Sequence, residues 1–220
     1  MEKYSITSID DIDTQSITFD NIGNKCPIKK PIKYKNCLCF IKLLNTSFPY
    51  GVTKSSNNFW SICCQLNDNQ IKQFNKIDEL LINYGIKYYN ELFELWQIPM
   101  FDEISGEKIS LPSIKSTIKN NYVTIIKNNK STVNISLGFI DHTSCYDFDL
   151  FIEEDGPEPV KIKPNNINNA KKYININTNG SVLFEPVMWI SKNEYGLALN
   201  CYQIKIQKSI TTYKSVCYLD

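Results

Sequence analysis

Apolar and polar residues alternate over several short runs of the chain. In the run 59–66 (FWSICCQL), Trp60, Ile62 and Cys64 share one strand face, and Phe59 lies on the other. Side chains alternate across a strand, so such a run predicts a strand with one buried face. Runs with strand character occupy 27–45, 59–66, 122–140 (two strands joined at 128–130), the start of 145–173, 181–190, 195–207 and 210–219.

A second pattern, with apolar residues every three or four positions, begins at Asn69. It continues to Tyr84, is interrupted at Gly85, and resumes as far as Trp96, before Pro99. This spacing places an apolar stripe on a helix, so it predicts a helical hairpin at about 69–97 with a break at Gly85. The segments 46–58 and 100–121 carry the Pro, Gly and Ser residues that are typical of loops.

These patterns predict a mainly β protein with inserted helices (α+β). Many short strands and one helical hairpin favour an OB-like Greek-key barrel with long loops, and a β-sandwich carrying a helix is the alternative. At 220 residues the chain can bury a sizeable core. We expect an N-terminal arm or first edge strand at 1–25 and a single OB-like domain at 26–220. The domain would contain the helical insertion at about 69–97 and a charged, Asn-rich insertion at about 153–180.

The charge of the chain restricts how it could bind a polyanion. The net charge is +1, so no global field attracts nucleic acid, and any binding site must be a local patch. All 24 basic residues are Lys. Without Arg, the bidentate reader of guanine edges and phosphates is missing. The composition therefore disfavours sequence-specific duplex recognition relative to non-specific contact through Lys and aromatic side chains.

The cysteines indicate a reducing compartment. None of the eight Cys residues forms a C-x2-C pair, and most lie within apolar strand patterns, where free Cys acts as a small hydrophobe. The N-terminal segment lacks the pattern of a signal peptide, and no apolar run approaches ~18 residues. We therefore expect a protein that is neither secreted nor membrane-spanning, in the cytoplasm or nucleus.

Two groups of residues could form a metal site or a catalytic site. The first group is a cluster of carboxylates between positions 147 and 155, and such clusters can bind Mg²⁺. No Lys or His base stands at a spacing typical of a nuclease. We therefore favour the solvated end of a strand over a nuclease site. His142 and Cys145 lack the paired spacing of a zinc site, and a loop histidine is favoured over a Cys–His nucleophile. No Gly-rich phosphate loop is present. We expect no catalytic residue, no metal site and no cofactor. The clustered carboxylates are Asp147, Asp149, Glu153, Glu154 and Asp155.

Aromatic and Lys residues that interleave on the strands are the remaining signal. Trp60, Trp96 and Trp189 can be core residues, and we favour this for Trp60 and Trp96. Large aromatics on a polar-patterned face need another reason, and base stacking is one. The residues predicted to bind nucleic acid are Tyr34, Phe40, Lys42, Phe48, Tyr50, Lys54, Phe59, Lys192, Tyr195, Tyr202 and Lys205.

Three segments together resemble a known family. FIKLLNTSFPYGVTKSSNNFWSICCQL (40–66) is similar to the strand, loop and strand of the OB-fold single-stranded-DNA-binding proteins of nucleocytoplasmic large DNA viruses, distant relatives of the phage-type proteins. FNKIDELLINYGI (74–86) resembles the helix that follows, and MWISKNEYGLALNCYQIKI (188–206) resembles the closing ribbon. The chain departs from that pattern by lacking the first Pro of the loop and by reducing the acidic tail to Leu219-Asp220.

The resemblance implies a non-catalytic protein that coats single-stranded DNA during viral replication or recombination, in the viral factory of the host cytoplasm or in the nucleus. It implies replication proteins (polymerase, helicase/primase) as partners, and it leaves a homo-oligomer open. On the residues alone, a virion or scaffold protein that uses an OB-like fold for protein contacts is the alternative. In the binding interpretation, Tyr50→Ala with Phe59→Ala should weaken oligo-dT binding by ~2 kcal/mol or more.

Overall fold

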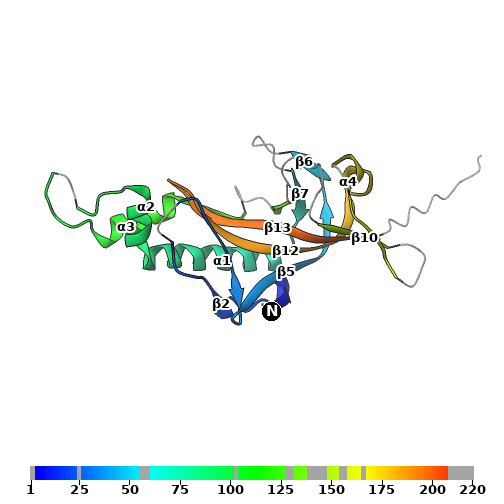
Figure 1. The fold of residues 1–220 in the computed structure, drawn as a ribbon, viewed down its shortest axis with the longest axis horizontal. Helices are drawn as coiled ribbons and strands as arrows, with labels where there is room; N and C mark the ends of the chain where they lie inside the picture. The colour runs from blue at the N-terminus through cyan, green and yellow to red at the C-terminus, as the bar shows by residue number, and fades with distance from the viewer. Residues whose placement is uncertain are drawn as a thin grey trace, which may run out of the picture.

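The computed structural model describes residues 3–23, 26–54, 60–101, 104–126, 131–137, 148–153, 158–164 and 167–207. Five strands form its centre: β5 (Cys37–Phe48), β7 (Trp60–Gln65), β9 (Thr132–Ser136), β12 (Thr178–Ile190) and β13 (Tyr195–Ile206). The long ribbon of β12 and β13 crosses the middle of the molecule, with β7 above it and helix α1 (Asp68–Lys87) below (Figure 1).

The five strands follow one another in the ring order β5–β7–β9–β13–β12–β5. β7 and β9 pair antiparallel, β9 and β13 parallel, and β13–β12 and β12–β5 antiparallel. β7 lies beside β5 at the remaining junction, where Thr46 Oγ1 donates to the carbonyl of Gln65 at 2.7 Å. Taken in chain order, the strands run 1-2-3-5-4 around the ring, the Greek-key order of an OB barrel. The predicted fold class is confirmed.

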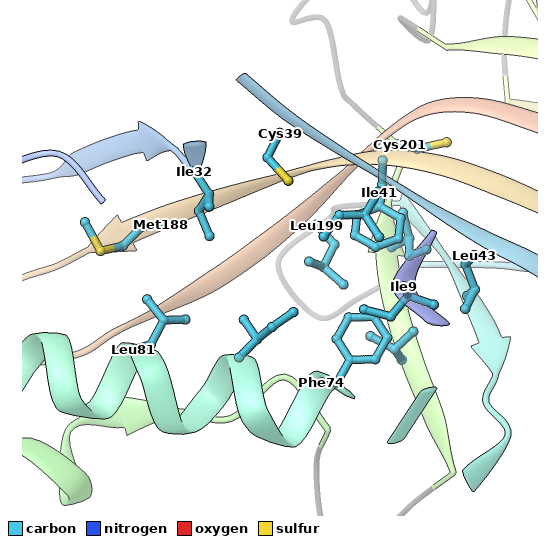
Figure 2. Close-up of a cluster of buried hydrophobic side chains, with 14 of the residues drawn as sticks. Ile9, Ile32, Cys39, Ile41, Leu43, Phe74, Leu81, Met188, Leu199 and Cys201 are labelled. Carbon is cyan, nitrogen blue, oxygen red and sulfur yellow. The ribbon is translucent and has the colours of Figure 1, made fainter. Parts of the chain in front are cut away.

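The core lies between the ring and α1. Ile41 of β5 and Leu199 of β13 lie in this core with Phe74 and Leu81 of the helix (Figure 2). A capping box at the start of α1 fixes the entry of the helix, because the Asn67 side chain accepts from the Gln70 amide and the Gln70 side chain accepts from the Asn67 amide. These contacts set the orientation of the helix against the sheet.

The predicted break at Gly85 is wrong, because α1 continues through it to Lys87. A Cβ atom at position 85 would lie 2.8 Å from Cζ of Tyr195, so the helix needs Gly there to accept that ring. The hairpin is completed by α2 (Tyr89–Trp96). A further helix, α3 (Leu111–Asn120), lies in the segment predicted as loop, where Ser110 caps it and Pro112 occupies its first turn.

The remaining elements extend this framework. The segment 27–45, predicted as one strand, is divided into β3 (Ile28–Pro31), β4 (Lys33–Tyr34) and β5, with Lys35 and Asn36 at positive φ between the last two. The Asn-rich insertion contains β11 (Val160–Ile162) and α4 (Ile167–Tyr173). The other short strands are β6 (Val52–Lys54), β8 (Tyr122–Val123) and β10 (Asp149–Ile152).

The N-terminal residues belong to the same sheet and core. β1 (Tyr4–Ser8) pairs parallel with β5, and β2 (Ile17–Thr18) pairs with β4. The 3₁₀ helices η1 (Ile9–Asp11) and η2 (Thr14–Ser16) connect them, and Ile9 is fully buried against α1. The division of the chain into an arm at 1–25 and a domain at 26–220 remains a prediction.

Several predicted features lie outside the described residues: Phe59, His142, Cys145, Asp147, Glu154, Asp155 and the strand at 210–219. In the described part of the chain, no helix has the length and apolarity needed to cross a membrane. Nor do the described His, Cys, Asp and Glu side chains gather in threes where a metal ion could be held. Of the acidic run, Asp149 pairs with Lys161 at 2.7 Å, and Glu153 pairs with Lys205 at 2.6 Å.

Candidate nucleic-acid interface

A groove of about 570 Å³ lies on the outer face of the barrel, over β7, β9 and β13. β13 pairs with β8 at Tyr195 and Gly196, and next with β9 only at Asn200. Between these two contacts, residues 197–199 of β13 line the groove. The segment 123–125 forms the wall of the groove next to β13. In OB barrels the face of strands 2 and 3, flanked by the loops between strands 1 and 2 and between strands 4 and 5, takes oligonucleotides. Here those strands are β7 and β9.

The floor of the groove consists of small polar side chains. Ser61 on β7 lies opposite Ser136 on β9, and Cys63 lies opposite Asn134. Thr53 Oγ1 of β6 lies 3.3 Å from Ser61 Oγ, which joins the loop strand to the floor. A floor without large side chains leaves room for a flat ligand between the aromatic residues at the edges.

Trp60 forms one edge of the groove and carries two cations. Lys54 Nζ lies 5.5 Å from the centre of the Trp60 ring, and Lys171 Nζ of α4 lies 4.7 Å from it. Both Lys side chains are exposed, and neither has a carboxylate partner among the described residues. An indole with two unpaired ammonium groups beside it combines a stacking surface with positive charge.

Trp189 lines the groove at the far end of the β12–β13 ribbon. It lies opposite Gly196 in the register, and a Cβ atom at 196 would meet Trp189 Cζ2 at 3.2 Å and the Val123 carbonyl at 2.9 Å. Gly196 thus allows the indole and the groove wall to approach the same point of β13. The turn beyond Trp189 is fixed by Trp96, whose Nε1 donates to the Ser191 carbonyl at 3.0 Å.

The wall at 123–125 is held by a buried carboxylate on α1. The backbone N–H of Ile125 donates to Asp78 Oδ1 at 3.2 Å, and the Tyr122 hydroxyl donates to the same oxygen. Burial raises the pKa of Asp78, and these two hydrogen bonds oppose the shift. Burial also raises the pKa of the Tyr122 hydroxyl, which keeps it protonated as a donor. Asp78 therefore connects the helix in the core to the wall of the groove.

Of the predicted binding residues, the structure brings two to this groove. Tyr50 lines it and is 63% exposed, on the loop that joins β5 to β6. Lys54 lies beside Trp60. Gly51, at φ +58, allows the tight turn after Tyr50, because a Cβ atom there would meet the Ile174 carbonyl at 2.8 Å.

Three predicted binding residues are buried, so their proposed contact with a base is corrected. Phe48 is fully buried, and its ring lies 3.2 Å from where a Cβ of Gly180 would be. Tyr195 lies between α1 and the sheet, with its ring 5.1 Å from that of Tyr122 and 5.9 Å from that of Trp96. Tyr34 packs in the core beside β5. Of the three, Phe48 was predicted in the loop 46–58 and is instead the last residue of β5, where its side chain enters the core.

Four predicted residues lie on a different surface, the outer face of β1, β5, β12 and β13, which we call the outer sheet face. The Phe40 ring lies 5.1 Å from the Tyr202 ring and 6.3 Å from the Tyr4 ring. Tyr202 is the extra residue of a bulge, since Leu183 pairs with Gln203 and Phe184 pairs with Cys201. The predicted residues on this face are Phe40, Lys42, Tyr202 and Lys205.

The last described member of the predicted set, Lys192, is exposed in the turn of the β12–β13 ribbon, beside Gln97 at the end of α2 and away from the groove floor. The prediction missed Trp60 and Trp189 as groove residues, and it missed Lys171, which lies against the Trp60 ring. Trp96 is buried as expected, whereas Trp60 and Trp189 are only partly buried. The available signal was the position of Trp60 at the start of a strand, directly after the loop.

The solved structures that are similar to this chain include three of one phage protein. They are the single-stranded DNA-binding protein from bacteriophage Enc34 (TM-score 0.44, 13% identity, 85% of this chain and 89% of that one), its C-terminal truncation (0.40, 12%, 88% and 94%) and its complex with ssDNA (0.41, 12%, 88% and 96%). No protein-family model matches the sequence, and no curated protein matches it. A likeness at this level identifies no ligand, so a function has to be argued from the surface of the chain itself.

Proposed function

We propose that the protein binds single-stranded DNA in the groove over β7, β9 and β13, without sequence specificity and without catalysis. The single observation that carries this proposal is Trp60, which has two Lys ammonium groups against its ring at the edge of a groove with a small polar floor. Base stacking on aromatic side chains is worth about 1–3 kcal/mol per base and tolerates any sequence.

The lysines next to Trp60 would serve the phosphates. A base that stacks on the indole takes the place of one ammonium group, and the displaced group can turn to the phosphate of the same nucleotide. A cation–π contact at an exposed site is worth about 0.5–1 kcal/mol, less than stacking plus a new charge contact. Replacing a cation–π contact by base stacking and a phosphate contact is therefore favourable. In the free protein, the two ammonium groups occupy the positions at the indole that the base would take.

The finer role follows from the sequence resemblance. We propose that the protein acts in viral DNA replication or recombination, in the viral factory or the nucleus of the host cell, with replication proteins such as polymerase or helicase/primase as partners. Lys54 and Lys171 would provide the phosphate contacts at the Trp60 edge of the groove.

The test is binding of fluorescein-labelled oligo-dT, followed by anisotropy over a salt series. For single strands the slope of log K against log[salt] is about −0.7 per neutralised phosphate, so affinity should fall steeply as salt rises. The matched ligands are oligo-U and a duplex of equal length, and we expect the duplex to bind more weakly than oligo-dT. Absence of salt-sensitive oligo-dT binding at micromolar protein would overturn the proposal.

A second candidate is a virion or scaffold protein, and the outer sheet face is the observation that favours it. Tyr4 and Tyr202 are 67% and 51% exposed there, while Lys205 is neutralised by Glu153. An exposed aromatic row with paired charges suits a protein partner better than a polyanion. In that case Tyr202→Ala would abolish assembly, and Trp60→Ala would leave it intact.

A further inference from the structure

β1 forms a free edge of the sheet. The N–H of Leu38 donates to the carbonyl of Lys3, and the parallel register Tyr4↔Leu38 and Ile6↔Phe40 follows from this bond. Residues 3, 5 and 7 therefore direct their backbone groups toward β5, and the N–H and C=O groups of Tyr4 and Ile6 point away from it. Among the described strands, β1 pairs with β5 alone.

Among the described residues, this edge lacks the protection that edge strands usually have. Natural edges are shielded by Lys, Pro, bulges or covering elements. β1 has the sequence YSITS, with no charge and no Pro, and its alternate residues Tyr4 and Ile6 are 67% and 45% exposed. An uncharged edge with two exposed apolar side chains is suited to the addition of another strand.

We propose that β1 pairs with β1 of a second copy of this chain, antiparallel, about a twofold axis at Ile6. This arrangement places Ile6 opposite Ile6 and Tyr4 opposite Ser8, so the central pair is apolar. Lys3 at one end of the strand would meet the region of Asp11 of the other copy, since antiparallel strands bring opposite ends together. A parallel pairing would instead place Lys3 against Lys3.

The position of β1 leaves the groove open in such a dimer. The start of the chain lies below β5, whereas β6, β7 and α4 lie above the β12–β13 ribbon (Figure 1). The pairing would also extend the outer sheet face, because the Tyr4–Phe40–Tyr202 row of one copy continues into that of the other. Two grooves on one dimer could then engage one strand of DNA, and dimerisation itself does not depend on that function.

The decisive experiment is a cross-link at the twofold axis. In a hydrogen-bonded antiparallel pair the two Cα atoms are about 5.5 Å apart, within the roughly 4.4–6.8 Å that a disulfide spans. Ile6→Cys should therefore give a disulfide-linked dimer on mild oxidation. Tyr4→Cys is the matched control, because its opposite residue is Ser8, and it should not cross-link. The wild-type chain controls for the native cysteines.

Light scattering on a size-exclusion column gives the second readout. The wild-type chain should elute, over a concentration series, with a mass approaching twice 25.5 kDa. Ile6→Lys should be monomeric, since two Lys would meet at the axis, and Tyr202→Lys should stay dimeric. A monomeric wild type, a dimeric Ile6→Lys protein, or equal cross-linking by Tyr4→Cys would overturn the proposal.

Discussion

The groove and the outer sheet face both present aromatic residues and lysines on strands, yet their lysines have different partners. In the groove, Lys54 and Lys171 lie against Trp60 and have no carboxylate partner among the described residues. On the outer sheet face, Lys205 is paired with Glu153 at 2.6 Å, whereas the exposed Lys42 has no carboxylate partner among the described residues. On the neighbouring β11, Lys161 is paired with Asp149 at 2.7 Å. A lysine can contribute to the binding of a polyanion only when no carboxylate neutralises it. The side chains that contact these lysines come from other parts of the chain.

The largest expected effect separates the aromatic residues of the two surfaces. Tyr50→Ala with Trp60→Ala should weaken oligo-dT binding by about 2 kcal/mol or more, on the stacking energies of two bases. Phe40→Ala with Tyr202→Ala is the matched pair and should leave the affinity unchanged. Anisotropy titration measures both, and equal losses from the two pairs would remove the distinction between the surfaces.

A second prediction compares the carboxylates that each region buries. Asp78→Leu leaves the Ile125 N–H and the Tyr122 hydroxyl without their acceptor, so it should lower the free energy of unfolding by about 1–3 kcal/mol. Glu185→Leu, on the outer sheet face, should cost little, because the side chain of the partly buried Glu185 makes no hydrogen bond within the described part of the chain, and its backbone pairing with β13 is kept. Urea unfolding measures both. Asp78→Leu should also weaken oligo-dT binding in the folded protein, since it frees the groove wall.

The salt dependence sharpens the comparison further. Lys171→Ala should reduce the slope of log K against log[salt] by about 0.7, the value for one phosphate contact on a single strand. Lys172→Ala is the control, because Lys172 is the adjacent exposed residue on α4 and, among the described contacts, only Lys171 of the two lies against the Trp60 ring. Lys205→Ala should likewise leave the slope unchanged. An unchanged slope for Lys171→Ala would show that this lysine only covers Trp60.

The smallest expected effect is a pH dependence on the outer sheet face. Burial raises the pKa of Glu185 above its ordinary value near 4.5, so the folded chain binds this proton more tightly than the unfolded chain. The contribution of Glu185 to stability must then fall as pH rises through the window that starts at 4.5 and ends at the raised pKa. The Glu185→Gln variant lacks this dependence of the free energy of unfolding on pH. The stability of the variant relative to wild type should therefore increase as pH rises through that window. Urea unfolding at several pH values checks the sign.

Much of the fold follows from local patterns in the sequence. The alternation at 59–66 and 133–139 and the turn at 191–194 identify β7, β9 and the β12–β13 ribbon. Gly85 could not be interpreted locally, because its role depends on Tyr195, a residue over a hundred positions away. α3 was missed because Ser110 and Pro112 are loop residues by composition and start signals of a helix by position.

The candidate site was less predictable than the fold. Tyr50 and Lys54 were predicted because Tyr50 lies in the loop between two strands, next to Pro49 and Gly51, and Lys54 follows it. The burial of Phe48 and Tyr195 could not be predicted, because register and helix packing, which no single strand shows, decide which face is buried. The pairing of Lys171 with Trp60 joins α4 to β7 across the insertion, so no local pattern could have revealed it.

The most direct measurement of the central claim is a photochemical map of bound DNA. The folded chain is irradiated with oligo-dT that carries photoreactive thymine analogues, and mass spectrometry locates the cross-linked peptides. The account predicts cross-links at Tyr50, Trp60 and Trp189, with none at Phe40 or Tyr202, and their loss at high salt. Cross-links concentrated on Phe40 and Tyr202, with Trp60 unmodified, would contradict it.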